Sequence, residues 1–166
     1  MNKKKLFNTI FFVLAVYAVY LKLPSIISHF KFQDQKAPDF KVKLLSNKEV
    51  DLNKLQRKVV LVFWATWCGP CEVELKRVNE MIQIKKLQPD DVLAISMGEN
   101  IEVVQKTVKE KNYLFNVGTD ADEKISHLYK VSATPTVIFI DEKQTINWMT
   151  AGISPTLEFR ITSFFK

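Results

Sequence analysis

The sequence predicts an α/β domain with a mixed central sheet flanked by helices, preceded by an N-terminal membrane-targeting helix. Three observations support this prediction. Apolar runs typical of strands alternate with helix-like patterns along most of the chain, and the last two runs flank a polar turn. A cysteine pair, Cys68 and Cys71, directly follows one apolar run. An uncharged apolar stretch, residues 6–21, lies near the start of the chain.

The apolar stretch follows three lysines, Lys3, Lys4 and Lys5, and carries no charge until Lys22. As a helix, residues 6–23 would be about 27 Å long, slightly short of the ~30 Å hydrocarbon core of a bilayer, and Lys22 can reach the far interface. We predict a signal anchor over residues 1–23, with a cleaved signal peptide as the alternative. Lysines before the segment place the N-terminus in the cytoplasm. The prediction is a single-pass protein of the inner (cytoplasmic) membrane, with its domain on the periplasmic or extracytoplasmic side.

Residues 24–36 show no long hydrophobic period and predict a tether, which leaves residues 37–166 as the folded domain. At the start of this domain, a strand at 40–44 and a short helical turn at 51–55 flank a polar turn. The run 59–64 is apolar on both faces, which predicts a central strand.

A helix-like apolar period follows over 70–87, and Pro89 closes it. A strand at 91–97 and a helix that Asn100 caps and that ends near residue 111 come next. The remaining patterns predict a short strand at 115–117, a helix at 121–129, an antiparallel hairpin of strands 136–140 and 145–151, and a last helix at 156–164 opened by Ser154 and Pro155. A domain of this size buries roughly two-thirds of its unfolded surface, so it needs no disulfide for support. Its two cysteines are free for chemistry.

The cysteines lie in the run Trp67-Cys68-Gly69-Pro70-Cys71, between an apolar strand and a helix pattern. At such a junction, free backbone N–H groups and the positive end of the helix dipole stabilise a thiolate, the form of cysteine that attacks disulfides. Cys68 is expected just ahead of the helix and Cys71 one turn inside it. We therefore expect Cys68 to attack and Cys71 to resolve. Pro70 fits the first helical turn, and Gly69 leaves room for a partner to approach.

Other interpretations of the cysteines and of the charge are weaker. Two cysteines cannot complete a four-ligand zinc site, and His29 and His127 lie far away without ligand spacing, so no metal or other cofactor is predicted. An inert structural disulfide is the other alternative. The net charge of +6 does not indicate nucleic-acid binding, because residues 1–35 carry +4 of it and the remaining charges of residues 36–166 are mixed in sign.

A second signal is Thr134-Pro135, directly before the apolar run 136–140. A proline at the start of a strand can follow a cis peptide bond. With the cysteine motif, the run Ala133-Thr134-Pro135-Thr136 resembles the thioredoxin superfamily. More closely, residues 37–164 resemble the membrane-tethered TlpA/ResA-like thiol-disulfide reductases, relatives of the cytochrome c maturation type. The motifs that carry this closer resemblance are Ala37-Pro38-Asp39-Phe40, residues 63–68, residues 134–141, and Glu74 three residues after the second cysteine.

This resemblance implies a thioredoxin fold with Pro135 in cis beside Cys68, and with the Thr134 backbone pairing with an extended substrate segment. Trp67 is expected to flank the thiolate on the surface, whereas Trp64 is expected to pack in the core. The residues predicted to contact substrate are Trp67, Gly69, Pro70, Thr134 and Pro135.

The sequence departs from the family pattern at two points. The acidic residue that thioredoxin buries on its central strand would fall at Val62, and Lys143 and Gln144 replace the glycine common in the hairpin turn. Because the buried acidic residue of thioredoxin is missing at Val62, we assign the role of proton acceptor to Glu74. In the tethered reductases a glutamate at this helix position lies near the cysteines, and we hypothesise that Glu74 takes the proton from Cys71 as Cys71 attacks the mixed disulfide. The alternative is a solvated helix residue.

The predicted activity is enzymatic thiol-disulfide exchange. The Gly-Pro dipeptide matches thioredoxin, whose potential is ~−270 mV against ~−120 mV for the oxidant DsbA, and so favours a reductant. Outside the cytoplasm such a reductant would need a membrane thiol-disulfide electron donor, and the resemblance suggests apocytochrome c or another exported disulfide-containing protein as substrate. The rivals are a disulfide oxidant or isomerase on the same fold, a peroxiredoxin-type peroxidase that would need a threonine at Ala65, and a non-enzymatic tethered assembly or copper-delivery module.

Overall fold

The computed structural model describes residues 34–166 and, before them, residues 7, 11–13 and 17, which are helical and exposed. The rest of the signal anchor predicted over residues 1–23, and most of the predicted tether, lie outside the described residues. Among the helices that the structure describes, none has the length and apolar character needed to cross a membrane.

A five-stranded mixed sheet forms the centre of the domain, with the strand order β5-β4-β3-β6-β7. Strand β4 runs parallel to β3 and to β5, whereas β6 runs antiparallel to β3 and to β7. The strands are β3 (Val59–Trp64), β4 (Val92–Met97), β5 (Asn116–Asp120), β6 (Thr136–Ile140) and β7 (Ile146–Ala151). All six residues of β3 are buried, which confirms the predicted central strand. The mixed sheet and the terminal hairpin are therefore as predicted.

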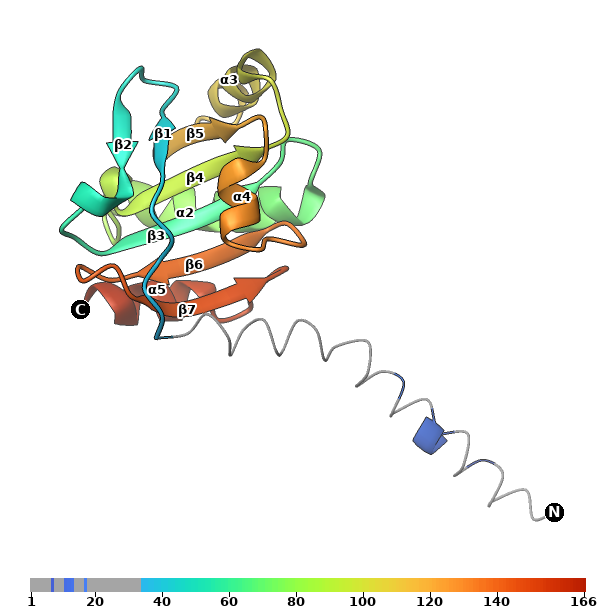
Figure 1. Cartoon of the computed structure of the whole chain (residues 1–166). Helices are drawn as coiled ribbons and strands as arrows, with labels where there is room; N and C mark the ends of the chain where they lie inside the picture. Colours follow the sequence, from blue (N-terminus) through green and yellow to red (C-terminus); the bar gives the residue numbers. More distant parts are fainter. Residues whose placement is uncertain (1–6, 8–10, 14–16, 18–33) are drawn as a thin grey trace. The chain divides into compact units, whose positions relative to one another are not determined.

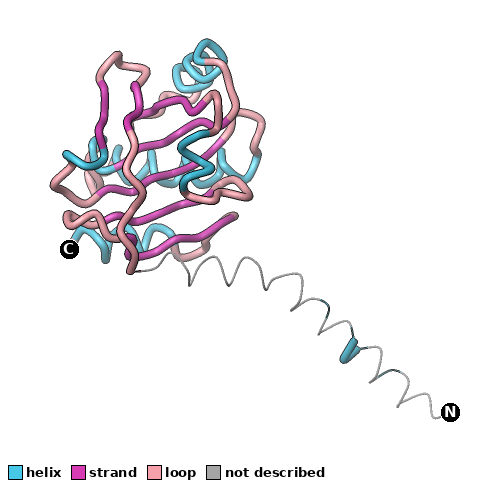
Figure 2. Tube along the Cα trace, in the orientation of Figure 1, coloured by secondary structure: helices cyan, strands magenta, loops and turns pink. Residues whose placement is uncertain are grey.

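Helices cover both faces of the sheet, with α4 in front of it and α2 and α5 behind it in Figure 1. These helices are α2 (Gly69–Gln83), α3 (Ile101–Glu110), α4 (Lys124–Leu128) and α5 (Leu157–Phe165). Alternation along β3 divides the core between the two faces. Val62 and Trp64 belong to the apolar cluster that α2 and α5 cover. Phe63 points the other way, where its ring centroid lies 5.6 Å from that of Tyr129. Figure 2 shows the same layers coloured by element type.

Helix α2 ends at Gln83, four residues before the predicted end. Lys85 has a left-handed φ of 59°. The N–H groups of Lys85 and Lys86 donate back to the carbonyls of Ile82 and Met81, each at 2.9 Å. This pattern is a Schellman cap, which stops a helix. The apolar period of the sequence extends to residue 87 because Leu87, which lies in the loop after the cap, is also buried.

One helix start and one capping contact also differ from the prediction. Helix α4 begins later than expected because Asp120 caps it: its two carboxylate oxygens accept hydrogen bonds from the N–H groups of Ile125 at 3.0 Å and Ser126 at 2.7 Å. Asn100 is the N-cap residue of α3, as predicted, but its side chain makes no capping hydrogen bond.

The segment before the sheet, residues 34–45, crosses the domain from one edge strand to the other, and we call it the N-terminal strap (Figure 1). At the β7 edge, the N–H of Asp34 donates to the carbonyl of Ile146 at 2.8 Å. At the β5 edge, the N–H of Leu45 donates to the carbonyl of Val117 at 2.8 Å. The remaining short elements are β1 (Lys41–Lys43), β2 (Glu49–Asp51) and the 3-10 turns η1 (Leu52–Lys54) and η2 (Pro89–Asp91).

Candidate active site

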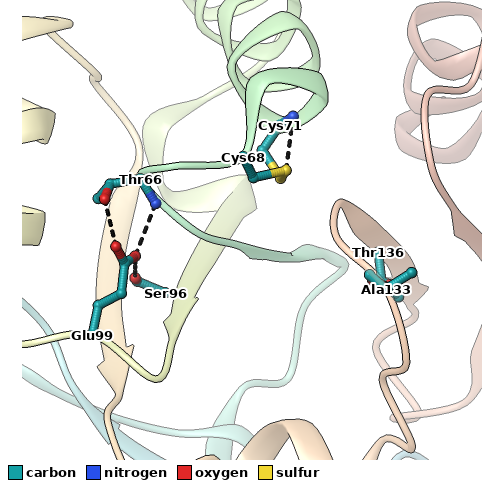
Figure 3. Close-up of a disulfide and its surroundings, with 7 residues drawn as sticks. All are labelled: Thr66, Cys68, Cys71, Ser96, Glu99, Ala133 and Thr136. Carbon is teal, nitrogen blue, oxygen red and sulfur yellow. Dashed lines mark hydrogen bonds between the residues drawn. A yellow bond between two sulfur atoms is a disulfide. The ribbon is translucent and has the colours of Figure 1, made fainter.

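The cysteine pair lies where β3 ends and α2 begins, and a disulfide joins Cys68 to Cys71 (Figure 3). Cys68 is the N-cap residue of α2, and the Cys71 N–H donates a hydrogen bond to the Cys68 sulfur at 3.2 Å. The sulfur of Cys68 therefore lies at the start of a 15-residue helix, where N–H groups without helical partners and the helix dipole favour negative charge. This arrangement can stabilise a Cys68 thiolate once the disulfide is reduced.

Exposure differs between the two cysteines. Cys68 is 6% exposed and Cys71 is 0% exposed, so an incoming disulfide has better access to Cys68. Next to Cys68, the Trp67 side chain is 76% exposed. The surface at Gly69 is open, because a Cβ atom built there would meet no atom within 4 Å, and Pro70 is exposed in the first turn of α2. The order of attack stays a prediction that these exposures favour.

The Thr134-Pro135 peptide bond is cis, as the family resemblance implies. The strand register aligns Thr136 of β6 with Phe63 of β3, so the turn before β6 and the loop after β3 lie at the same end of the sheet. The Thr136 hydroxyl donates to the carbonyl of Ala133 at 2.7 Å, which closes the turn around the cis bond. Pro135 is buried and Thr134 is half-buried. Figure 3 shows this turn on the opposite side of the disulfide from Thr66.

Glu99 is a candidate that the sequence reasoning missed. Its carboxylate accepts hydrogen bonds from the Thr66 N–H at 2.8 Å, from the Thr66 hydroxyl, and from the Ser96 hydroxyl at 2.5 Å. Because Thr66 lies two residues before Cys68, Glu99 fixes the loop that leads to Cys68 (Figure 3). A signal for it was present: Glu99 comes two residues after the end of β4, which is parallel to β3, and parallel strands bring their carboxyl ends to the same edge.

Glu74 lies on α2, three residues after Cys71, and is 1% exposed. One carboxylate oxygen lies 3.2 Å from the Arg77 guanidinium, and the other accepts a hydrogen bond from the Ser154 N–H. The alternative of a solvated helix residue is therefore wrong. The proton-accepting role of Glu74 stays a prediction.

Aromatic side chains support the end of β3. Trp64 is 2% exposed, as expected for a core residue, and its ring meets Tyr113 edge-on at a centroid distance of 6.0 Å. Burial, together with the charge of Glu72, raises the pKa of Tyr113 to about 12.

In the described part of the chain, no three histidine, cysteine, aspartate or glutamate side chains are grouped closely enough to hold a metal ion.

Comparison with known proteins shows the family. Residues 34–149 match the model of the AhpC/TSA family. The thiol-disulfide oxidoreductase ResA of Geobacillus kaustophilus is 33% identical over 117 residues, which cover 70% of this chain and 67% of that protein. A ResA protein of Bacillus cereus is 36% identical over 109 residues, which cover 65% of this chain and 63% of that protein. The match thus leaves about a third of each relative uncovered.

The fold agrees with this assignment. A solved structure from Chlorobium tepidum, of a putative thiol:disulfide interchange protein DsbE, superimposes with a TM-score of 0.72 and 28% identity, over 81% of this chain and 98% of that one. The chain therefore belongs to the AhpC/TSA family, among the thioredoxin-fold thiol-disulfide oxidoreductases that resemble ResA.

Proposed function

We propose that this protein is an extracytoplasmic thiol-disulfide oxidoreductase that reduces disulfides in exported proteins such as apocytochrome c. The observation that carries the proposal is the Cys68–Cys71 disulfide at the start of α2, at the same end of the sheet as the cis-proline turn at Pro135. The relatives named above support the class of reaction, because each is named for thiol-disulfide chemistry.

In the proposed reaction, the reduced protein acts through two exchanges. The Cys68 thiolate attacks one sulfur of the substrate disulfide, the substrate S–S bond breaks, and the departing substrate thiolate takes up a proton. The Cys71 thiol then loses its proton to Glu74 and attacks the Cys68 sulfur, which releases the second substrate thiol. The substrate gains two electrons and two protons, and the Cys68–Cys71 pair is left oxidised. A dithiol protein of the membrane would reduce the pair again.

Substrate contact is proposed around the cysteines. An extended segment of the substrate would pair with the backbone of Thr134 as an added strand, next to Pro135. The exposed ring of Trp67 and the open surface at Gly69 and Pro70 would accept the residues that flank the substrate disulfide. This arrangement would bring a protein disulfide, rather than a small molecule, to Cys68.

The proposed location rests on the sequence before the domain. Three lysines followed by an uncharged apolar stretch are typical of a signal anchor that leaves the following domain outside the cytoplasm. A fusion of alkaline phosphatase to Lys166 is expected to be active, because that enzyme needs an oxidising compartment to form its disulfides. An inactive fusion of the full chain that is present in the cell would contradict this location.

The direction of the reaction is tested by the reduction potential of the Cys68–Cys71 couple. The purified full chain would be equilibrated with glutathione and dithiothreitol buffers, and its free thiols alkylated and counted by mass. A potential near or below the ~−270 mV of thioredoxin is expected for a reductant. A value close to the ~−120 mV of DsbA would make the protein an oxidant.

A cellular test separates this enzyme from a non-enzymatic tethered module. Cells that carry Cys68→Ser in place of the wild-type protein should lose the reduction of its exported substrate, because the attacking sulfur is gone. Full function in the Cys68→Ser strain would contradict the proposed reaction.

A further inference from the structure

One arginine side chain bridges α2 to the segment that joins β7 to α5. Arg77 donates from Nη1 to the Glu74 carboxylate at 3.2 Å and to the carbonyl of Ser154 at 2.9 Å. Its Nε donates to the Glu158 carboxylate at 3.0 Å, and its Nη2 to the carbonyl of Pro155 at 3.4 Å. Four acceptors, one on α2, two on the connecting segment and one on α5, therefore surround the guanidinium of Arg77, whose side chain is 22% exposed.

The contacts of Arg77 matter most at Glu74, which is the most deeply buried of its partners. A buried carboxylate needs hydrogen-bond donors on both oxygens or a paired charge. Arg77 supplies the charge at one oxygen, and the Ser154 N–H supplies a donor at the other. Because Arg77 also binds the Ser154 carbonyl, it holds in place the donor that Glu74 uses.

The same segment reaches the cis-proline turn. Two residues before Ser154, the Gly152 N–H donates to the carbonyl of Pro135 at 2.7 Å. A path of short contacts therefore runs from Glu74 on the cysteine helix, through Ser154 and Gly152, to Pro135. Arg77 fixes the end of this path that lies next to α2.

We propose that Arg77 is a positioning residue for thiol-disulfide exchange: it holds the Glu74 carboxylate and the segment after β7 in one arrangement, so that Glu74 is placed to take the proton from Cys71. This inference rests on the proposed function and on the proton-accepting role of Glu74. An arginine suits the role because its planar group donates in several directions at once, whereas the ammonium of lysine is a compact point charge.

The test follows the two exchange steps separately. The full chain is reduced, freed of reductant and mixed with oxidised insulin, and samples are quenched with acid and alkylated. Mass measurement then gives the amounts of reduced protein, mixed disulfide and oxidised protein over time. Wild type is compared with Arg77→Gln, Arg77→Lys, Glu74→Gln and the double variant Arg77→Gln/Glu74→Gln. Lys76→Gln is the matched control, because Lys76 is a neighbouring cation whose side chain is 73% exposed.

Arg77→Gln should leave the first step unchanged and slow the second by about tenfold or more, so that the mixed disulfide accumulates. Arg77→Lys should recover part of this loss, and Lys76→Gln should behave as wild type. The double variant should resolve the mixed disulfide no more slowly than Glu74→Gln alone, because Arg77 acts through Glu74. The double variant also leaves no unpaired buried charge, which keeps the test valid if Arg77→Gln unfolds.

Two results would overturn the inference while the proposed function stands: resolution at the wild-type rate in Arg77→Gln, or a double variant that shows the full product of two independent losses. A wild-type chain that stays fully reduced with insulin, forming neither mixed disulfide nor oxidised protein, would instead contradict the proposed reaction and overturn the inference with it.

Discussion

Two carboxylates, one on the helix that carries the cysteines and one after β4, each accept a hydrogen bond from the backbone of a loop. Glu99 binds the N–H of Thr66 in the loop before Cys68, and Glu74 binds the N–H of Ser154 in the segment after β7. Hydrogen bonds to charged acceptors are stronger than those between neutral groups. At the scale of single residues, one acidic side chain therefore holds the loop before Cys68, and another joins the helix of the cysteines to the segment after β7.

Replacing Glu99 by alanine should lower the free energy of unfolding by about 1–3 kcal/mol, because the N–H of Thr66 and the hydroxyl of Ser96 lose their acceptor in a partly buried place. Urea unfolding of the oxidised chain measures this change. Glu102→Ala is the matched control, since Glu102 is exposed in the first turn of α3. Equal stability of the Glu99 and Glu102 variants would show that the loop does not depend on Glu99.

The sequence predicted the cysteines, Pro135 and Glu74 because short motifs carry them. It did not predict that Glu74 is buried, since its partner Ser154 is 80 residues away along the chain and meets it only in the folded domain. Glu99 was missed for a similar reason. Its partner Thr66 lies on a neighbouring loop, and no local pattern links the two.

At the scale of elements, the helix and strand types were predictable from apolar periodicity, but several boundaries were not. The residues that end or turn the elements have left-handed φ values without being glycine: Lys85 after α2 at 59°, Glu123 before α4 at 58°, and Gln144 in the β6–β7 turn at 62°. Glycine is the usual signal for such positions, so its absence hid the end of α2 and the start of α4, whereas the polar run still marked the β6–β7 turn. At Gln144, the side chain offsets the missing glycine by donating to the carbonyl of Leu52 at 2.8 Å.

Lys85→Gly should raise the free energy of unfolding by about 0.5–1 kcal/mol, because glycine adopts the left-handed conformation at the C-cap of α2 without steric conflict. Lys86→Gly provides the control. Lys86 is an equally exposed lysine outside the left-handed positions, and glycine there should lower stability slightly. Thermal unfolding of both variants measures the difference. A lower melting temperature for Lys85→Gly than for wild type would contradict the assigned cap.

At the scale of the whole molecule, two tyrosines connect the parts of the core. The Tyr129 hydroxyl donates to the carbonyl of Pro38 at 2.7 Å, and its ring contacts those of Phe40 and Phe63, so it joins the N-terminal strap to the front face of the sheet. Burial, with the nearby charge of Asp39, raises the pKa of Tyr129 well above its usual range. The pKa of Tyr113 behind the sheet is raised to about 12, again mainly by burial.

These shifts predict a loss of stability in alkali. An unfolded tyrosine loses its proton near pH ~10, whereas the folded chain keeps both protons to higher pH. Between pH 10 and about 12 the unfolded state therefore binds fewer protons, and the free energy of unfolding falls as pH rises; below pH 10 the contribution is fully present. Urea unfolding at pH 8, 10 and 11 measures the fall. Tyr113→Phe should make it shallower, and an unchanged slope would contradict the assignment to Tyr113.

The sequence pattern was sufficient for the α/β class, and the motifs were sufficient for the family. Neither predicted the pairing of the N-terminal strap. Its ends contact β7 and β5 through backbone groups, which leave no mark in the side-chain pattern.

Those backbone contacts have a consequence for solubility. The outer edge of a sheet carries unpaired N–H and C=O groups that can pair with another chain and begin aggregation. Here residues 34–45 cover part of both outer edges at once, at β7 and at β5. A chain shortened to begin at residue 46 should therefore self-associate at concentrations where the full domain stays monodisperse, and light scattering of the two chains compares them. The N-terminal strap thus keeps part of both sheet edges from pairing with another copy of the domain.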